Sequence, residues 1–373
     1  MHNRSENIVY GVSELVGRTP LFELCCSGNG SRLLLKLEQF NPTGSAKVRM
    51  AAQMVRDAEL SGRLRPGGHI IEPTSGNTGL GLALMAIERG YRFTAVVDHH
   101  AAKDKMRNLA ALGTDLVYIG EEGTGGPQTM ARRERAGELA DAEENAHWPD
   151  QHNNPGNTEG YRGLAHELLS DLHGDVDYLI GAVGTGGSLC GTAKELRRLG
   201  SDVTTIGVEP HGSIIFGGPG SKYWQSGSGS PQGFPVGSNV DYSAIDDGVK
   251  VGDKEAFATA RMIARRTGLL IGGSAGAAVL TALKRLAAMP AGSTAVTLIC
   301  DAGEKYLDTV FDDEWMSERG LLDPAVDEEL NRLYDGYAGP VPTFPGKEMR
   351  EPGKEMREPG EEIRETVKAG SRA

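Results

Sequence analysis

The chain passes from a strand to a helix at Asn41-Pro42-Thr43-Gly44-Ser45-Ala46-Lys47-Val48-Arg49-Met50. The apolar run before it, 33–37, is typical of a buried strand. Asn-Pro and Thr-Gly supply turn residues, and Ser45 is predicted to cap the helix that follows. Lys47 then falls in the first turn, where the helix dipole disfavours a positive charge. An amine held neutral can attack an aldehyde, so Lys47 is a candidate nucleophile; the alternative is a surface lysine at a helix start.

The composition limits the classes of protein that this chain can be. Its 373 residues suit two packed lobes better than one ordinary core. The formal net charge is −12, so we expect no nucleic-acid partner. No apolar window suits a membrane span and no signal peptide is recognised, so we expect no membrane association and a cytoplasmic location. Cys25 and Cys26 are expected to be buried hydrophobes, and His69, His99 and His100 lack metal-site spacing, so no metal is expected.

Strands and helices alternate along most of the chain. Apolar strands are predicted at 70–72, 92–98, 115–119, 177–183, 204–208 and 294–301, with helices between them. This rhythm predicts an α/β fold of two doubly wound, mostly parallel sheets. Residues 147–157 are predicted to be a connecting loop. Residues 211–240, rich in Gly, Ser and Pro, are predicted to be a long loop, and loops of that length are usually functional.

The two lobes are expected to be discontinuous in sequence. The large lobe takes residues 1–50 and 157–322, and the small lobe takes residues 51–156. From 323 to 373 the pattern of core residues stops, and a seven-residue repeat begins at Pro345. That period suggests a coiled coil, but Pro-Gly in each unit breaks a helix, so the tail is predicted to be disordered.

A glycine-rich turn, Gly184-Thr185-Gly186-Gly187-Ser188, stands between a predicted strand and a predicted helix. Backbone amides, two hydroxyls and the helix dipole can cradle an anion there. The turn lacks the Gly-Lys-Ser/Thr of a Walker loop, and Leu189 replaces the third glycine of a GxGxxG motif. The turn therefore predicts a small phosphorylated cofactor; the alternative is a tight turn whose glycines only ease packing.

Two further strand-to-helix turns carry polar groups. Residues 74–78, Thr-Ser-Gly-Asn-Thr, can hold a carboxylate with backbone N–H groups and hydroxyls. Residues 272–276, Gly-Gly-Ser-Ala-Gly, let a hydroxyl and the backbone approach a ligand closely. Ordinary N-capping is the alternative at each turn. With Lys47, cradles for a phosphate, a carboxylate and a ring describe a site for pyridoxal 5'-phosphate (PLP).

These four motifs resemble, in their order, those of the fold type II (tryptophan synthase β-like) PLP enzymes, specifically the cysteine synthase and cystathionine β-synthase family. The resemblance covers about residues 8–316 and implies that Lys47 forms a Schiff base with PLP, and that the protein is a homodimer. It implies further cofactor contacts from Asn77 at the 3-hydroxyl, from Gly184, Thr185, Gly186, Gly187 and Ser188 at the phosphate, and from Ser274 at the pyridine nitrogen. It implies a substrate carboxylate site made of Thr74, Ser75, Gly76, Thr78 and Gln151.

The resemblance also implies a reaction. Ser274 would not enforce a protonated pyridine ring, which suits β-elimination better than transamination, and Lys47 could act as the base at Cα. The expected activity is β-replacement on O-acetyl- or O-phospho-L-serine, through an aminoacrylate. One alternative is a cystathionine β-synthase-like reaction. Another is the synthesis of a 2,3-diaminopropionate precursor, because residues 212–217 and 306–309 are similar to siderophore-pathway enzymes.

Two remaining alternatives are disfavoured. A dehydratase or lyase of the same fold usually has Ser-Phe-Lys at the lysine and a longer glycine loop, unlike Ser45-Ala46-Lys47 and 184–188. A non-catalytic binding protein would not need to retain Lys47, Asn77 and Ser274 together.

Two positions depart from the family pattern. Val48 stands where the family usually has Asp, and His152 stands where an aromatic residue is common, which leaves the substrate open. Arg132 and Arg133 could reach an anionic second substrate. Because their predicted helix, 128–144, is highly charged, we interpret them as part of a solvated face.

Overall fold

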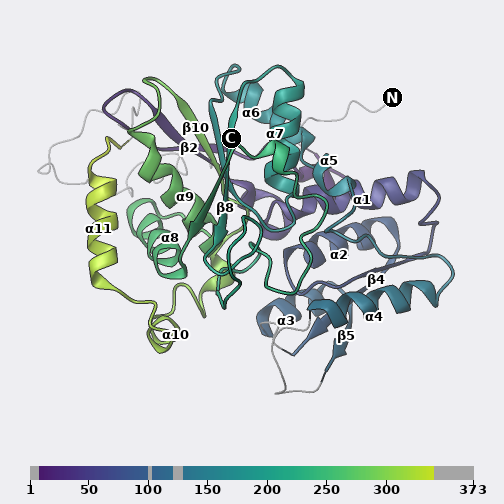
Figure 1. Cartoon of the computed structure of the whole chain (residues 1–373). Helices are drawn as coiled ribbons and strands as arrows, with labels where there is room; N and C mark the ends of the chain where they lie inside the picture. The colour runs from purple at the N-terminus through teal and green to yellow at the C-terminus, as the bar shows by residue number, and fades with distance from the viewer. Residues whose placement is uncertain (1–7, 100–102, 121–128, 340–373) are drawn as a thin grey trace, which may run out of the picture. The chain divides into compact units, whose positions relative to one another are not determined.

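The computed structural model describes residues 8–99, 103–120 and 129–339, and Figure 1 shows the arrangement of its helices and strands. The seven-residue repeat, and with it the part of the predicted disordered tail from 340 onward, lies outside the described residues. Two sheets carry the fold, one of six strands and one of four.

The larger sheet is parallel except at one edge. Its strands lie in the order β1 (Leu21–Cys26), β2 (Arg32–Lys36), β10 (Thr294–Leu298), β7 (Tyr178–Ala182), β8 (Thr204–Pro210) and β9 (Asp247–Val251). Within this sheet β1 and β2 form the antiparallel pair, and the other neighbours are parallel. Parallel sheets are covered on both faces, which explains why the central strands β10 and β7 are mostly apolar and buried.

Helices cover both faces of this sheet, as Figure 1 shows. One face packs against α8 (Asp253–Thr267) and α9 (Gly273–Leu286), with α10 (Asp313–Glu318) and α11 (Pro324–Asp335) outside them. The other face packs against α6 (Arg162–Asp171) and α7 (Gly187–Arg198), and the short α5 (Gly156–Glu159) joins this layer. The described residues also form five 3₁₀ turns: η1 (Val12–Leu15), η2 (Glu38–Phe40), η3 (Pro42–Gly44), η4 (Tyr242–Ala244) and η5 (Gly303–Tyr306).

The smaller sheet is wholly parallel. Its order is β5 (Asp115–Ile119), β4 (Arg92–Asp98), β3 (His69–Glu72) and β6 (Ala146–His147). Helices α2 (Asn77–Arg89) and α3 (Lys103–Ala111) share one hydrophobic cluster with it, and α4 (Thr129–Asp141) packs in a second cluster. These four strands all fall within 51–156, and the six strands of the larger sheet fall outside it. The predicted α/β fold of two mostly parallel sheets is confirmed.

Helix α1 (Lys47–Leu60) lies where the two parts meet. Met50 and Met54 point into the core of the larger part, and Val48 and Val55 point into the core of the smaller part. Residues three and four apart share a helix face, so this spacing gives α1 two apolar stripes rather than one. The helix thus fixes Lys47, its first residue, at the boundary between the two sheets.

The structure corrects four details of the sequence prediction. Ser45 does not cap α1: its backbone is extended and bridged to Asp301, its buried hydroxyl has no partner among the described residues, and Ala46 is the N-cap. The predicted loop 147–157 begins inside β6 and ends inside α5. No strand forms at 268–271, where the chain makes a single bridge at Ile271.

The fourth correction concerns the predicted disordered tail from 323. Residues up to 339 are described, and α11 packs on α8 with Leu330 only 3% exposed. Asp323 caps this helix by accepting from the N–H of Ala325. Its few apolar residues lie at helical spacing among many charges, so the sequence signal is weak although the buried stripe is real.

Candidate active site

A cavity of about 950 Å³ lies at the carboxyl ends of β3 and β7. In α/β sheets the loops after parallel strands usually form the ligand site. Most of the walls come from these segments and single residues: Lys47, 73–78, Lys105, 129–133, 151–152, 184–185 and 221–237. The structure therefore brings together Lys47, the 74–78 loop, Gln151 and the start of the 184–188 turn, which are far apart in sequence.

Lys47 is the first residue of α1 and lines this cavity. Thr43 and Gly44, both with left-handed backbones, turn the chain into the helix just before it. Burial lowers the pKa of Lys47, and Cys300 and Asp301 act in the opposite direction. Removing an ammonium from water disfavours its charged form, so the site favours a neutral, nucleophilic amine.

The 74–78 loop forms the start of α2. The hydroxyl of Thr78 donates to Oε1 of Gln151 at 2.6 Å, and Oγ1 of Thr74 accepts from the N–H of Gly79 at 3.2 Å. Ser75, Gly76 and Asn77 also line the cavity. Hydroxyls and amides at a helix N-terminus suit a bound carboxylate.

The loop that carries Gln151 is held from behind by a buried carboxyl group. Glu72, 1% exposed, accepts from the backbone N–H groups of Asp150 at 3.0 Å and Gln151 at 3.3 Å. Burial raises the pKa of Glu72 to about 8, although the two hydrogen bonds act against that shift. Behind Gln151, Nδ2 of Asn157 donates to the Gln151 carbonyl at 2.6 Å and to the hydroxyl of Thr185 at 3.0 Å. Asn157 therefore links the 74–78 side of the cavity to the glycine turn.

The glycine turn leads into α7. Gly184 and Thr185 line the cavity, whereas Gly186, Gly187 and Ser188 are not among the lining residues. Gly186 is the N-cap with φ +87°, and a Cβ there would lie 2.4 Å from the carbonyl oxygen of Asn239. No side chain caps this helix. Its first amides can therefore serve an anion.

Ser274 is the second residue of α9 and is 7% exposed. It is not among the residues that line the cavity. Gly272, just before it, leaves room for Asp301, because a Cβ at Gly272 would lie 2.2 Å from Oδ1 of that carboxylate. The expected contact of Ser274 with a pyridine ring therefore stays a proposal.

The two arginines do not form a solvated face. Arg132 and Arg133 line the cavity, and their side chains are only 14% and 17% exposed. Arg132 lies 3.3 Å from a carboxylate oxygen of Asp98. Arg133 makes two bonds to Asp150, at 2.9 and 3.1 Å, and its guanidinium lies 5.0 Å from the Trp148 ring. The charge pattern of the predicted helix gave the wrong exposure for these two arginines, because neighbouring elements cover this face of α4.

His152 also lines the cavity. Burial, reinforced by nearby Arg133, lowers the pKa of its imidazole to about 4, and its ring stands edge-on to Phe234 with centroids 5.2 Å apart. The imidazole is therefore neutral at neutral pH, so His152 contributes an aromatic surface rather than a charge.

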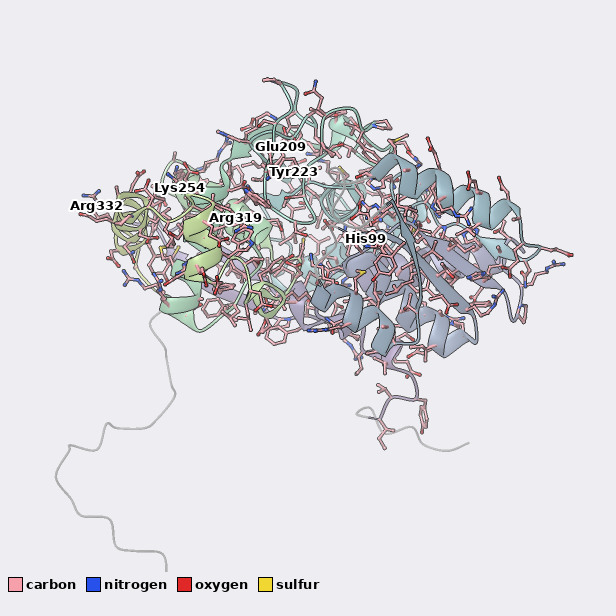
Figure 2. The ribbon with its side chains drawn as sticks, turned by 90° about the horizontal axis from the view of Figure 1, so that it is seen from below. His99, Glu209, Tyr223, Lys254, Arg319 and Arg332 are labelled. Carbon is pink, nitrogen blue, oxygen red and sulfur yellow. The ribbon has the colours of Figure 1, made fainter. Side chains whose placement is uncertain are left out.

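The long loop 211–240 supplies one wall of the cavity. In the sequence, only the length and composition of this segment indicated a functional role. Glu209, fully buried at the end of β8, accepts from the N–H groups of Ile215 and Phe216. Tyr223 lies close to Glu209 (Figure 2), and burial together with this carboxylate raises the pKa of Tyr223 to about 12. Asp253 accepts from the N–H groups of Trp224 and Gln225. These anchors hold the loop against β8 and α8.

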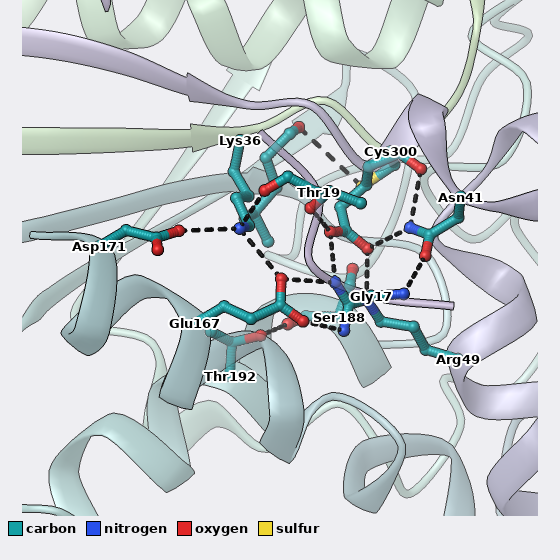
Figure 3. Close-up of polar contacts among 12 residues, drawn as sticks. Gly17, Thr19, Lys36, Asn41, Arg49, Glu167, Asp171, Ser188, Thr192 and Cys300 are labelled. Atoms are coloured by element: carbon teal, nitrogen blue, oxygen red, sulfur yellow. Dashed lines mark hydrogen bonds and ion pairs between the residues drawn. The ribbon is translucent and has the colours of Figure 1, made fainter. Parts of the chain in front are cut away.

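A buried ionic network lies behind α1 (Figure 3). Arg49, two residues after Lys47, bonds both oxygens of Glu38, at 2.6 and 2.8 Å, and both oxygens of Glu167, at 2.8 and 2.9 Å. Lys36 adds an ion pair to Glu167 at 3.0 Å. Arg49 and Lys36 lower the pKa of Glu167 to about 2. The network joins α1 to β2, η2 and α6.

No group of three or more His, Cys, Asp or Glu side chains in the described residues could hold a metal ion. Within the same residues, no helix is both long enough and apolar enough to span a membrane.

The cavity fits PLP. It presents an amine whose neutral form is favoured, an uncapped helix N-terminus beside Thr185, and a buried Ser228 hydroxyl that has no partner among the described residues. A phosphate accepts hydrogen bonds from such groups, and an aldehyde reacts with such an amine. Two mostly parallel sheets with this site define the fold type II class of PLP enzymes.

Comparison with known proteins places the chain more narrowly. It belongs to the family described as pyridoxal-phosphate dependent enzymes, whose family model matches residues 12–301. It is 49% identical over 328 residues to a Sinorhizobium fredii protein named "Putative cysteine synthase", covering 88% of this chain and 98% of that one. It is 33% identical over 313 residues to the N-(2-amino-2-carboxyethyl)-L-glutamate synthase of Ralstonia nicotianae, covering 83% and 92%.

A solved structure of a related enzyme is also similar to this chain. The O-acetylserine-dependent cystathionine β-synthase of Helicobacter pylori has 31% identity and a TM-score of 0.73, covering 81% of this chain and 98% of that one. The predictions of a PLP cofactor and of a PLP-dependent enzyme of the cysteine synthase family are confirmed.

Proposed function

We propose that this enzyme replaces the β-substituent of an activated L-serine, O-acetyl- or O-phospho-L-serine, with a nucleophile. The observation that carries the proposal is Lys47, an amine with a lowered pKa that shares one cavity with the 74–78 loop and the 184–185 turn. The names of the relatives support the same reaction type, because they include a cysteine synthase and an O-acetylserine-dependent synthase.

The proposed binding residues combine cavity-lining residues with Gly186, Gly187, Ser188 and Ser274, which the family resemblance implies. For the cofactor they are Lys47, Asn77, Gly184, Thr185, Gly186, Gly187, Ser188 and Ser274. For the substrate carboxylate they are Thr74, Ser75, Gly76, Thr78 and Gln151. PLP bound here would supply an electron sink next to Cα. Nζ of Lys47 would take the Cα proton as the bond from Cβ to the acetate or phosphate group breaks and that group leaves with the bonding electrons; Nζ would return the proton to Cα after the nucleophile has added to Cβ.

The charge of the cavity bears on the choice of substrate. Lys105, Arg132, Arg133 and Lys222 all line it, although Asp98 pairs with Arg132 and Asp150 with Arg133, and His152 is neutral at working pH. Cationic walls attract anions and so favour a phosphate leaving group or an acidic amino acid as nucleophile. The Ralstonia nicotianae relative, by its name a synthase of an L-glutamate derivative, supports keeping the diaminopropionate-precursor reaction as a candidate beside sulfide or homocysteine addition.

Titration of the PLP-loaded enzyme tests this proposal. O-acetylserine and O-phosphoserine are added separately while the visible absorbance is recorded. A shift of the cofactor band with only one ester identifies the leaving group. Sulfide, homocysteine and glutamate are then compared for their ability to restore the original band. A cofactor band that ignores both esters contradicts the proposal and favours unactivated serine as substrate.

We also propose a homodimer. The segment 8–15 exposes several large apolar side chains, including Ile8 at 57% and Tyr10 at 70%, and η1 within it packs on α2, where Ile87 is 56% exposed. Apolar side chains gathered in this way are typical of a surface that a second copy covers. Sedimentation equilibrium tests the proposal, and a monomer at micromolar concentration contradicts it.

A further inference from the structure

Lys305, to which the proposed function assigns no role, stands at the centre of a polar cluster around Asn77. It lies in η5, shortly after β10. Its Nζ donates to Oδ1 of Asn77 at 2.5 Å and to the carbonyl oxygen of Thr43 at 2.9 Å. On the other side of the same amide, Nδ2 of Asn77 donates to Oδ2 of Asp301 at 2.8 Å. A hydroxyl from Tyr306 fixes Asp301 in turn at 2.6 Å.

These contacts allow the Asn77 amide one orientation. A cation faces its oxygen and a carboxylate faces its nitrogen. Rotating the amide by half a turn would set its N–H groups against the ammonium and its oxygen against the carboxylate. Both charge-assisted bonds, the stronger kind in proteins, would be lost. Because Asn77 lines the cavity and Nδ2 carries a second hydrogen, the residue is held as a hydrogen-bond donor.

Lys305 also holds the turn that leads to Lys47. Thr43, whose carbonyl it binds, has a φ of +69°, a costly conformation for a β-branched residue. Such backbones persist only where their surroundings hold them. The next residue, Gly44, packs against the same side chain, because a Cβ there would lie 3.4 Å from Cε of Lys305. One ammonium thus supports both the Lys47 turn and the start of α2.

We propose that Lys305 is a positioning residue that, with Asp301, locks Asn77 as a donor to the cofactor oxygen and fixes the turn in front of Lys47. The inference rests on the proposed roles of Lys47 and Asn77. It adds that the hydrogen bond from Asn77 is set by a charged clamp rather than by Asn77 alone. A donor held in this way stabilises negative charge on the oxygen it faces.

The charge on Lys305 makes the clamp dependent on pH. Burial lowers the pKa of Lys305 to about 8; Asp301 and Glu304 act against that shift, and Lys105 adds to it. Below that pH Lys305 is an ammonium and the clamp is complete. As the pH rises through the pKa, the lysine loses its charge and the clamp weakens.

The experiment measures PLP affinity and the visible cofactor band from pH 6.5 to 9.5, after reconstitution of the apoenzyme. We compare the wild type with Lys305→Met, Lys305→Arg and Lys105→Met. Lys254→Met is the matched control, because Lys254 pairs with Asp323 at 3.0 Å outside the cavity. At pH 7 we expect Lys305→Met to weaken PLP binding about ten- to a hundredfold, the range for losing a hydrogen bond to a charged group.

The pH profile separates the clamp from simple packing. The wild type should lose PLP affinity with a midpoint near pH 8, the pKa of Lys305, and Lys105→Met should move that midpoint upward, because Lys105 is one of the groups that lower this pKa. Lys305→Met should lack that step, and Lys305→Arg should keep its affinity at pH 9 because a guanidinium stays charged. Lys254→Met should match the wild type throughout.

The experiment can reject the clamp and the proposed function separately, because each is contradicted by a different result. A wild type without any PLP band would reject the proposed function itself. If the wild type shows the PLP band but Lys305→Met binds PLP as tightly as the wild type, the clamp alone is rejected. The clamp is likewise rejected if Lys305→Met loses PLP affinity with the same dependence on pH as the wild type. Should Lys305→Met fail to fold, the comparison of Lys305→Arg with the wild type at pH 9 decides: equal losses of affinity reject the clamp.

Discussion

Replacing Arg49 with methionine tests the ionic network behind Lys47. The guanidinium is 5% exposed and bonds Glu38, which is fully buried, and Glu167, which is 16% exposed. Without Arg49, Glu167 keeps Lys36 at 3.0 Å. Among the described residues, Glu38 keeps two neutral donors, Thr19 at 2.6 Å and Asn41 at 2.9 Å. The variant therefore leaves one buried carboxylate without a cation, which costs about 3–5 kcal/mol of unfolding free energy.

Urea unfolding followed by tryptophan fluorescence measures this loss. Adding Glu38→Gln to Arg49→Met should recover part of it, because the unpaired charge is then gone. The control is Arg332→Met, which breaks an exposed pair with Glu328 and should cost less than about 0.5 kcal/mol. If Arg49→Met costs no more than this control, or if Glu38→Gln deepens the loss, the reasoning is wrong.

Two further predictions concern the loop that carries Gln151. With a folded pKa near 8 and an unfolded value of 4.5, Glu72 binds a proton in the native state that the unfolded chain releases, so its contribution to stability falls as pH rises from about 4.5 to 8. Glu72→Gln should remove this dependence of the unfolding free energy on pH, which amounts to at most about 1.4 kcal/mol per pH unit. The substitution can also change stability equally at all pH values, so the unfolding free energy is measured at both pH 5 and pH 8. A variant whose unfolding free energy changes with pH as much as that of the wild type would contradict the prediction. Thr78→Val removes the hydroxyl that donates to Gln151 and should raise KM for the serine ester about tenfold, with cofactor affinity kept; a change in PLP binding alone would contradict the assignment.

The sequence was informative where the chemistry lies in one contiguous stretch. Turns between a strand and a helix contain 74–78 and 184–188, and another such turn lies directly before Lys47. Local residue types identify turns of this kind. The fold followed from alternating strands and helices, because parallel sheets need buried apolar strands.

Other features depend on contacts that no short stretch records. Lys305 reaches Thr43 and Asn77 only because η5, η3 and α2 meet in space. Arg132 seemed solvated because its own helix is charged, yet other elements cover it. Ser45 has the composition of a cap, but its backbone is committed to a bridge with Asp301. In each case tertiary packing overrode the local preference.

The central claim is that Lys47 binds PLP covalently, and one measurement tests it most directly. Purified enzyme loaded with PLP is reduced with borohydride, and the modified peptide is identified by mass spectrometry, with Lys47→Ala carried in parallel. We expect the pyridoxyl group on Lys47 alone, and neither the visible band nor the modification in the variant. A label on another lysine, or a variant that keeps the band and turns over substrate, would contradict the claim.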